Sequence, residues 1–506
     1  MMICNSKQQQ PAAILFLSLI CLVVATTLAA DQPPTKEIQR GFSAKHDDSY
    51  SQFQSLLSDP TGVFALGFLR IDSNLLDLAV LHMPSSFPLW RAIPANPAPW
   101  TGSISLSFDG NLVLSDQKKG TVFWSTASDG TGDRVVLLNS SNLQIQKTGT
   151  PDSVPWQSFD YPSNTIVENQ NFTSHAKLLS TNQQFSMSLG ANYFGLYIEF
   201  GKGSNSGIYF KHTALEAKAQ IVPDGGPTYA RIGSDGFLGM YQKEGPPADV
   251  LSFDTFNRNY DVFYRMTLED DANLRAYYWN NTAWILDYTA ITEPCSLPTT
   301  CGSYSICRSQ EQPQCICLAN GTNGCLPAGN GDFCGASGVK SIVNGDGYGV
   351  LTRQGVDLAN KDFIDYTKMA SMEECHSTCQ KNCTCWGAIY SNTTKNCYMM
   401  DYPIEMLVEG DDNKFGYFKL KSAVDEDGDG DEKKKSEEDK LRLALLVVGC
   451  GILAAAAGFG AYQIWERRRR GRRGGSMEEG LAPGPYKDLA ASSFKSIELS
   501  DSFRKP

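Results

Sequence analysis

The sequence has little of what catalysis requires. Its five histidines are scattered, and none of them lies near a nucleophile-elbow motif. The Gly-rich loop and the catalytic-loop motif of protein kinases are both missing from the printed residues. We therefore predict no catalytic residue, no metal site and no cofactor, and the sequence argues against an enzyme.

Basic residues are also in deficit. The chain has 44 lysines and arginines against 55 aspartates and glutamates, which gives a formal net charge of -11. That balance argues against nucleic acid as a partner. Long amphipathic helical patterns are scarce outside the two ends, whereas Gly, Asn, Ser and aromatic residues are plentiful, so an all-β fold is favoured. A length of 506 residues predicts several domains.

The N-terminal end is typical of a secretory signal peptide. Lys7 precedes an apolar run at 12–30 that ends in small residues, which predicts a signal peptide at 1–30 with cleavage after Ala29 or Ala30. The alternative, a short membrane anchor, is disfavoured because the apolar core is short. Residues 31–45 are expected to be an unstructured lead-in.

A second apolar run, at 443–465, carries no charge and is long enough for one transmembrane helix, which takes roughly 20 residues. An arginine-rich block follows it, and such blocks stay on the cytoplasmic side. The prediction is a single-pass type I protein of the plasma membrane. Its ectodomain would be extracellular and residues 466–506 would form a cytoplasmic tail.

The stretch at 421–440 is strongly acidic. Residues 425–437 begin like an EF-hand loop, but Ser436 stands where that loop needs a glutamate. We interpret 421–440 as a solvated acidic stalk rather than as a calcium site.

Twelve of the fifteen cysteines lie between Cys295 and Cys397. An even number in a secreted segment predicts disulfides, although the sequence alone leaves the pairing open. The alternative is a zinc site, since His376 adjoins Cys375. The presumed ectodomain also contains six N-x-Ser/Thr glycosylation sequons, at Asn139, Asn171, Asn280, Asn320, Asn382 and Asn392.

A strand pattern repeats in the first half of the chain. Ile104, Leu106 and Phe108 alternate with small polar residues, which is the period of a half-buried strand. "FDGNLVL" at 108–114 is then echoed by "NSSNLQI" at 139–145, with Asn111 and Asn142 in the same place. Two such units indicate a β domain built from repeats.

These segments resemble a known family. The stretches similar in order and spacing to the bulb-type (G-type) lectin domain of plants are "LSDPTGVFALGF", "GNLVLSD", "TVFWSTASD" and "VVLLNSSNLQIQ". "WQSFDYPSNTIV" resembles the segment that closes this domain in S-receptor-like proteins. The resemblance implies a β-prism of three sheets at 46–164.

The resemblance continues along the chain. Residues 265–295 are similar to the end of the S-locus glycoprotein domain, which implies a second β domain at 165–294, although the usual Gly-Pro-Trp stretch is not evident upstream. Residues 295–325 resemble a small, disulfide-rich EGF-like module, assigned to 295–326. Residues 371–400 resemble an α+β PAN/apple domain, assigned to 334–420, with Cys375 and Cys379 on one helix.

The same resemblance implies a complete set of disulfides. The implied pairs are Cys295–Cys307, Cys301–Cys315, Cys317–Cys325, Cys334–Cys383, Cys375–Cys397 and Cys379–Cys385.

The mannose site of bulb-type lectins is Gln-x-Asp-x-Asn-x-Val-x-Tyr. Asp109, Asn111 and Val113 match this motif, but Ser107 and Ser115 replace the Gln and the Tyr. Both serines are too short to reach a sugar hydroxyl. The second copy, which has Asn142, keeps only the Asn. The favoured interpretation is that Asp109-Gly110-Asn111 makes a turn, since these residue types favour turns.

S-receptor-like proteins usually carry a cytoplasmic kinase, which residues 466–506 have no room for. The chain therefore resembles kinase-less plant PAN and lectin-domain membrane proteins. We expect a non-enzymatic cell-surface recognition protein for protein or carbohydrate ligands that depends on a partner such as a receptor kinase. The alternative is a membrane-tethered, mannose-type glycan-binding lectin.

Overall fold

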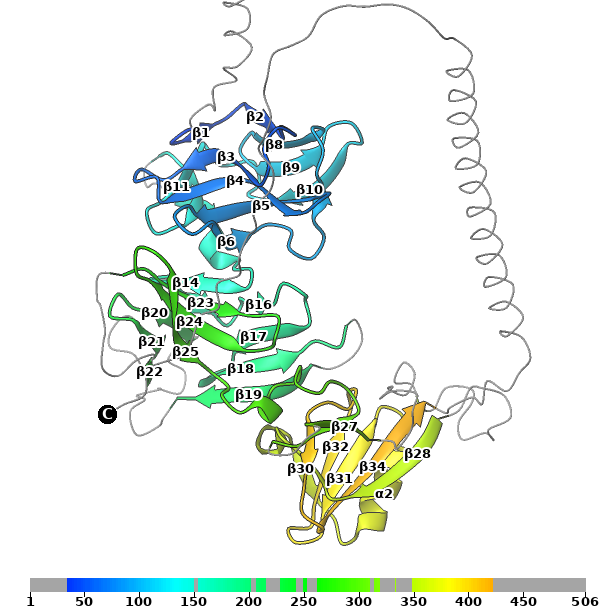
Figure 1. Ribbon diagram of the computed structural model, residues 1–506. Coiled ribbons are helices and arrows are strands. Elements are labelled where there is room, and N and C mark those ends of the chain that lie inside the picture. Colours follow the sequence, from blue (N-terminus) through cyan, green and yellow to red (C-terminus); the bar gives the residue numbers. More distant parts are fainter. Residues whose placement is uncertain are drawn as a thin grey trace, which may run out of the picture. The chain divides into compact units, whose positions relative to one another are not determined.

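The structure is a computed structural model that describes residues 34–149, 153–201, 206–214, 228–242, 249–252, 262–309, 314–318, 333 and 348–421 (Figure 1). The predicted signal peptide, transmembrane helix and cytoplasmic tail lie outside the described residues, as does the acidic stalk beyond Lys421. Within the described ranges, no helix is long and apolar enough to cross a membrane.

Three antiparallel sheets form the first domain. One contains β3 (Phe53–Ser58), β4 (Phe64–Asp72), β5 (Leu75–His82) and β6 (Phe87–Arg91) in that order, with β7 (Ala98–Pro99) beside β5. A second has the order β10 (Thr121–Ser125), β9 (Leu112–Asp116), β8 (Ile104–Phe108), β2 (Phe42–Lys45). The third has the order β1 (Ile38–Gln39), β11 (Arg134–Leu137), β12 (Leu143–Lys147), β13 (Ser153–Gln157).

Alternation explains why these strands share one core. Ile104, Leu106 and Phe108 are fully buried, while Ser107 between them is half-buried. The alternate residues of a strand point to opposite faces, so each sheet turns one apolar face inward. Leu66 from β4 and Ile145 from β12 join the same cluster, and the three sheets therefore enclose a single hydrophobic core.

Residues 38–45 correct one prediction. They were expected to lie in an unstructured lead-in, but β1 pairs with β11 and β2 pairs with β8. Ile38 is almost fully buried in the first core. Strands of two and four residues are too short to show an alternating pattern, and their partners lie far along the chain. The first domain therefore starts before residue 46.

The second domain repeats the strand order of the first. Its sheets are β14 (Thr165–Val167), β23 (Tyr264–Leu268), β24 (Leu274–Trp279), β25 (Trp284–Thr289); then β15 (Phe172–Thr173), β20 (Tyr229–Ile232), β21 (Phe237–Tyr241), β22 (Asp249–Ser252); and β16 (Leu178–Leu179), β17 (Phe185–Leu189), β18 (Tyr193–Ile198), β19 (Gly207–Thr213). In both domains the first two strands join the edges of sheets whose other strands come later in the sequence. The sheet whose strands lie between these early and late strands in the sequence, β3–β6 or β16–β19, is made of consecutive strands.

The cysteine-rich part forms two sheets. The larger has the order β28 (Tyr348–Gln354), β34 (Lys414–Lys421), β31 (Gly387–Ser391), β32 (Asn396–Met400), β30 (Tyr366–Lys368). The smaller has the order β27 (Cys315–Cys317), β26 (Ser305–Cys307), β33 (Leu407–Glu409), β29 (Val356–Leu358). Strands β26 and β27 belong to the segment assigned to an EGF-like module, and they share this sheet with strands of the predicted PAN region. The two segments therefore fold together here.

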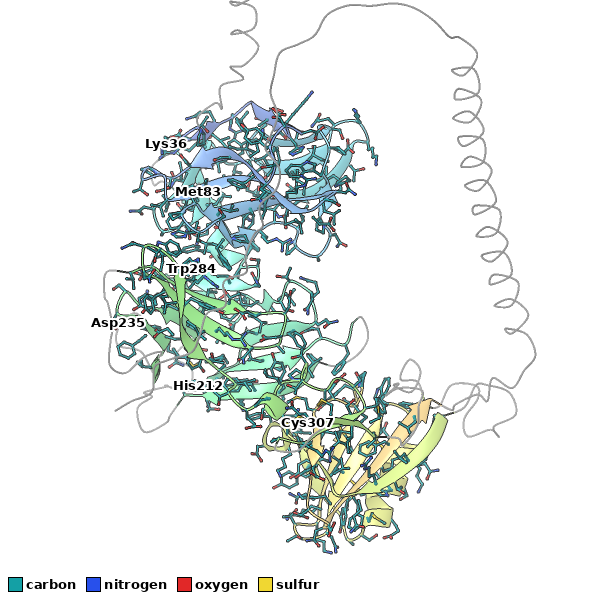
Figure 2. The ribbon with its side chains drawn as sticks, in the orientation of Figure 1. Lys36, Met83, His212, Asp235, Trp284 and Cys307 are labelled. Carbon is teal, nitrogen blue, oxygen red and sulfur yellow. A yellow bond between two sulfur atoms is a disulfide. The ribbon has the colours of Figure 1, made fainter. Side chains whose placement is uncertain are left out.

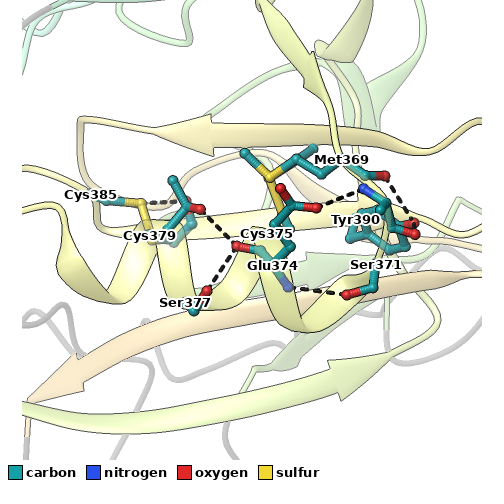
Figure 3. Close-up of a disulfide and its surroundings, with 12 residues drawn as sticks. Met369, Ser371, Glu374, Cys375, Ser377, Cys379, Cys385 and Tyr390 are labelled. Carbon is teal, nitrogen blue, oxygen red and sulfur yellow. Dashed lines mark hydrogen bonds between the residues drawn. A yellow bond between two sulfur atoms is a disulfide. The ribbon is translucent and has the colours of Figure 1, made fainter.

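One helix, α2 (Met372–Lys381), packs on the larger sheet (Figure 3). Ser371 caps it by accepting a hydrogen bond from the Glu374 amide, and the Glu374 carboxylate accepts one from the Ala370 amide. This reciprocal arrangement satisfies amides that have no partner inside the helix. Three short 3-10 turns, η1 (Ser158–Asp160), η2 (Pro294–Ser296) and η3 (Lys361–Phe363), complete the described elements.

The structure contains four of the disulfides that the resemblance implies. They are Cys295–Cys307, Cys301–Cys315, Cys375–Cys397 and Cys379–Cys385. Cys317 and Cys383 are also disulfide-bonded, and their implied partners, Cys325 and Cys334, lie outside the described residues. Because the Cys375 sulfur is bonded to Cys397, it offers no thiolate to a zinc ion beside His376.

Candidate functional site

The predicted sugar motif forms the hairpin of β8 and β9. Ser107 and Val113 face each other across the hairpin and are half-buried on the outer face of the sheet. The Asp109 side chain is 87% exposed at the tip, where its Oδ1 lies 3.6 Å from Nη1 of Arg40. The motif residues therefore do share one region of the surface.

Asn111 is engaged elsewhere. Its Oδ1 accepts hydrogen bonds from the Ser128 amide at 2.7 Å, from Ser128 Oγ at 2.6 Å and from the Gly130 amide at 3.3 Å. These bonds hold the loop that follows β10 against the hairpin. The side-chain oxygen that would contact a sugar hydroxyl in the lectin motif is thus committed to the backbone of the protein itself.

Ser115 also has a neighbour on this face. Gln117 Nε2 donates to Ser115 Oγ at 3.2 Å and to Ser105 Oγ at 2.7 Å. The amide of Gln117 therefore links the small hydroxyls where the lectin motif has a tyrosine. This arrangement favours the interpretation of residues 107–116 as a structural hairpin.

Two further asparagines make the same kind of brace. Asn142 Oδ1 accepts from Ser158 Oγ at 3.3 Å and from the Phe159 amide at 3.4 Å. Asn273, which is 1% exposed, donates to the Ile291 carbonyl at 2.7 Å and accepts from the Ile291 amide at 3.1 Å. In each case the asparagine opens the second strand of a hairpin and fixes the chain where it leaves the third strand.

The local backbone explains why these asparagines align. Each follows a residue in the left-handed region, namely Gly110 (φ 85°), Ser141 (φ 68°) and Ala272 (φ 71°). Each precedes a buried leucine, namely Leu112, Leu143 and Leu274. The repeat of "FDGNLVL" and "NSSNLQI" in the sequence therefore records a shared turn and brace, and the turn recurs in the second domain.

The second domain has one hairpin that the sequence interpretation missed. Gly236 has φ 74°, like Gly110, and Tyr241 stands five residues after it, as Ser115 does after Gly110. Tyr241 stacks on Tyr229 with ring centroids 5.2 Å apart, and the Arg231 guanidinium lies 4.8 Å from the Tyr241 ring. Asp235 precedes Gly236 at the end of this hairpin (Figure 2). "SDGFLGMY" was the available signal, but phenylalanine replaces the asparagine.

An aromatic cluster joins the two β domains. His82 of β5 lies 4.9 Å from the Trp279 ring and 5.2 Å from the Trp284 ring, and Trp284 Nε1 donates to Ser85 Oγ at 2.9 Å. Arg265 of β23 is buried, with its guanidinium carbon 3.8 Å from the Phe87 ring centroid. Burial, together with the positive charge of Arg265, lowers the pKa of His82 to about 4.

The glycosylation sequons are accessible where the structure describes them. The exposed asparagines are Asn139, Asn171, Asn280, Asn382 and Asn392, and Asn320 lies outside the described residues. At Asn280 and Asn382 the sequon threonine hydroxyl donates to the asparagine Oδ1, at 2.8 and 3.1 Å. These positions satisfy the requirement that a glycan acceptor lie at the surface.

Sequence comparisons identify three families along the chain. The D-mannose binding lectin family matches residues 90–188, the S-locus glycoprotein domain matches 243–322 and the PAN domain matches 352–421. The lectin match extends past residue 164, and the S-locus match extends into the segment assigned to an EGF-like module.

Two curated plant proteins illustrate the relationship. A PAN domain-containing protein of Arabidopsis thaliana is 40% identical over 92% of this chain and 93% of its own length. A G-type lectin S-receptor-like serine/threonine-protein kinase of the same plant is 26% identical over 65% of this chain but only 42% of its own. Among solved structures, a two-domain lectin from Scilla campanulata covers 50% of this chain at 14% identity, with a TM-score of 0.19. That score is too low to support any inference.

Proposed function

Because the chain belongs to the plant family of PAN domain-containing proteins that also carry lectin and S-locus glycoprotein domains, we propose that it is a non-enzymatic recognition protein of the plasma membrane. It presents its β domains and its cysteine-rich part, EGF-like and PAN, to extracellular protein or carbohydrate ligands. The single pass at 443–465 holds the ectodomain outside, and a separate receptor kinase transmits the signal.

One observation carries this proposal. The matched lectin and PAN families suggest carbohydrate or protein recognition, and direct contacts connect the two β domains and the cysteine-rich part. Trp284 bonds Ser85 between the β domains, and Asn360 Nδ2 donates to the Ile208 carbonyl at 2.7 Å between the second domain and the cysteine-rich part. A receptor needs such contacts so that its modules present a common surface.

Topology gives the first test. Intact cells expressing the full chain with a C-terminal tag are treated with protease, and we expect loss of the disulfide-rich region while the tag stays protected. A matched chain with Arg467–Arg470 changed to glutamine should insert less uniformly, because the positive charges set orientation. Antibody access to the tag on unpermeabilised wild-type cells contradicts the type I assignment.

Dependence on a partner gives the second test. Purified full-length protein incubated with ATP should incorporate no phosphate, whereas co-expression with the receptor kinase that it recruits should. Phosphorylation by the purified protein alone overturns the non-enzymatic assignment.

The alternative function is a membrane-tethered lectin of the mannose type. It predicts that Ser107→Gln combined with Ser115→Tyr raises mannose affinity in calorimetry with the full-length protein, because both replacements restore lost reach. Asp109→Ala is the suitable loss-of-function control, since Asp109 is exposed, whereas Asn111→Ala also releases the 128–130 loop. Tight mannose binding by the wild type that Asp109→Ala abolishes favours this alternative.

A further inference from the structure

A hollow of about 380 Å³ lies beside the tryptophans of the first domain. Its wall includes Trp90, Trp124, Trp156 and Tyr161, and Leu179 and Gln183 of the second domain complete it. The volume lies within the range of about 300–1,000 Å³ that is usual for small-ligand sites. None of the residues of the predicted mannose motif lines it.

The aromatic wall is held in place. Trp90, Trp124 and Trp156 meet edge to face, with centroids 5.6 to 5.8 Å apart. Trp90 Nε1 donates to the Tyr161 carbonyl at 2.8 Å, and the Tyr161 ring stacks on Trp156 at 5.9 Å with an interplanar angle of 7°. Tyr161 is nevertheless 60% exposed. The Tyr161 ring, together with the tryptophans, therefore presents aromatic surface on which a ligand can stack.

Polar side chains with unused hydrogen-bonding atoms lie around the same hollow. Gln183 uses Nε2 to donate to the Ser180 carbonyl at 3.0 Å, which leaves its Oε1 as an acceptor. Arg91 donates Nε to Asp77 Oδ2 at 2.9 Å, which leaves its terminal amino groups as donors. The hollow therefore offers one acceptor and further donors to a polar ligand.

Two backbone positions support the same conclusion. Ala127 and Gln183 both line the hollow, and they have φ values of 48° and 62°. Residues other than glycine adopt this region at a cost, and such strain is concentrated at binding sites. One of these strained residues belongs to each domain, so both domains shape the hollow.

We propose that this hollow binds one ring of a neutral sugar. A pyranose has an apolar face of C–H groups, which matches the Tyr161 and tryptophan wall, and a rim of hydroxyls, which matches Arg91 and Gln183. The charge of Arg91 is offset by the fully buried Asp77, so an acidic sugar is not favoured. An acyl chain would leave the Arg91 donors and the Gln183 acceptor unpaired.

This inference deepens the proposed recognition function and rests on it, but it does not use the mannose motif. It places the sugar where the two β domains meet. Occupancy would therefore strengthen their contact, because a ligand that binds only the assembled form stabilises that form.

The test uses full-length protein in detergent on an array of neutral glycans ending in mannose, glucose, galactose or xylose. The strongest ligand is then titrated while tryptophan fluorescence is recorded. We expect Tyr161→Ala to weaken binding about fivefold through lost stacking, and Gln183→Ala about threefold through one lost hydrogen bond. Tyr366, a tyrosine of the cysteine-rich part, is 53% exposed, and Tyr366→Ala is the matched control that should bind as the wild type does.

Each other outcome decides against the hollow. Glycan binding that Tyr161→Ala and Gln183→Ala leave unchanged, but Asp109→Ala removes, places the sugar at the hairpin and keeps the recognition function. Absence of binding to every neutral glycan overturns the inference as well. The recognition function is then still judged by the topology and phosphorylation tests, which do not depend on a sugar.

Discussion

The two β domains have the same strand order but fill it with different side chains. The first core contains Trp90 and Trp156 and no methionine, whereas the second contains methionines, including Met187 and Met266, and no tryptophan. Both domains nevertheless pair their strands in the same nested way. One sheet contains consecutive strands, and each of the other two pairs an early strand with strands from later in the sequence. The strand order therefore depends on where the apolar alternation and the turns fall, and not on particular core residues.

The domains also differ in how they brace their hairpins. The first uses Asn111 and Asn142, while the second uses Asn273 and has Phe237 where the β20–β21 hairpin would need an asparagine. A stack of Tyr229 and Tyr241 occupies the outer face there instead. The brace is thus optional in this fold, and losing it leaves a surface of different chemistry.

Truncating a core side chain should give the largest difference in stability between the two domains. Phe68 on β4 and Phe194 on β18 are both fully buried, and each lies on an inner strand of the sheet β3–β6 or β16–β19. Replacing either by alanine should cost about 3–5 kcal/mol through lost burial and a cavity. Because each phenylalanine lies in the core of its own domain, we expect Phe68→Ala to accelerate hydrogen exchange mainly in β3–β6 and Phe194→Ala mainly in β16–β19. Equal acceleration in both domains would show that they unfold as one unit.

Acidity should act on the junction between the domains. The pKa of His82 falls to about 4 in the folded protein because of burial and the charge of Arg265, against an ordinary value of 6.5. As the pH falls, the unfolded chain therefore binds a proton at this histidine before the folded protein does. The contribution of His82 to the free energy of unfolding is fully present above pH 6.5 and is lost as the pH falls to 4. The loss approaches about 1.4 kcal/mol per pH unit.

Chemical unfolding of wild type and His82→Phe across this range checks the expectation. The variant should show a flatter dependence, and His175→Gln, at an exposed site of the second domain, is the matched control. An unchanged slope in His82→Phe assigns the acid sensitivity to other groups.

The asparagine braces should rank by burial. Asn273→Ala removes both bonds to Ile291 in a site that is 1% exposed, and we expect a loss of about 2–3 kcal/mol. Asn111 is less buried, so Asn111→Ala should cost about 1 kcal/mol and loosen the 128–130 loop. Thermal unfolding measures both losses, and the reverse order would contradict the role of burial.

Surface charge should matter least. Arg40 is 43% exposed in its side chain and lies 3.6 Å from both Asp109 and Asp133, whereas Arg275 of the second domain is 19% exposed and pairs with Asp271 at 2.6 Å. Arg40→Ala should lower stability by about 0.5 kcal/mol, and Arg275→Ala by more. Repeating the unfolding in high salt should remove most of the Arg40 effect. An Arg40 loss that salt does not change means that the pair is not its cause.

Sequence alone predicted the elements that show their own periodicity. Ile104, Leu106 and Phe108 indicated a half-buried strand, and Glu374 and its neighbours indicated a helix that carries Cys375 and Cys379. The structure confirms both elements. It also contains the predicted repeat of Asn111 and Asn142. The two-residue strand at Ile38 was not predicted, because its evidence lies in Val135, its partner far along the chain.

The site was harder to predict than the fold. The resemblance located the motif at Ser107–Ser115, but no pattern in the sequence reveals that Asn111 bonds Ser128 and Gly130. The hollow at Trp90 was also out of reach, since its residues come from separate strands and from both domains. Trp124 and Trp156 are recognisable as apolar residues, but only the packed structure shows that they meet.

The nested pairing of each domain has a consequence for biosynthesis. Ile38 pairs with Val135, and Ile166 pairs with Met266, so the first strand of each domain must wait for most of that domain to emerge from the ribosome. Sheets closed by such distant partners form slowly, because a long loop must be ordered before the contact is made. Until then β1 and β14 offer open edges to other nascent chains. Because the two domains emerge from the ribosome one after the other, the strands of only one domain are left unpaired at a time.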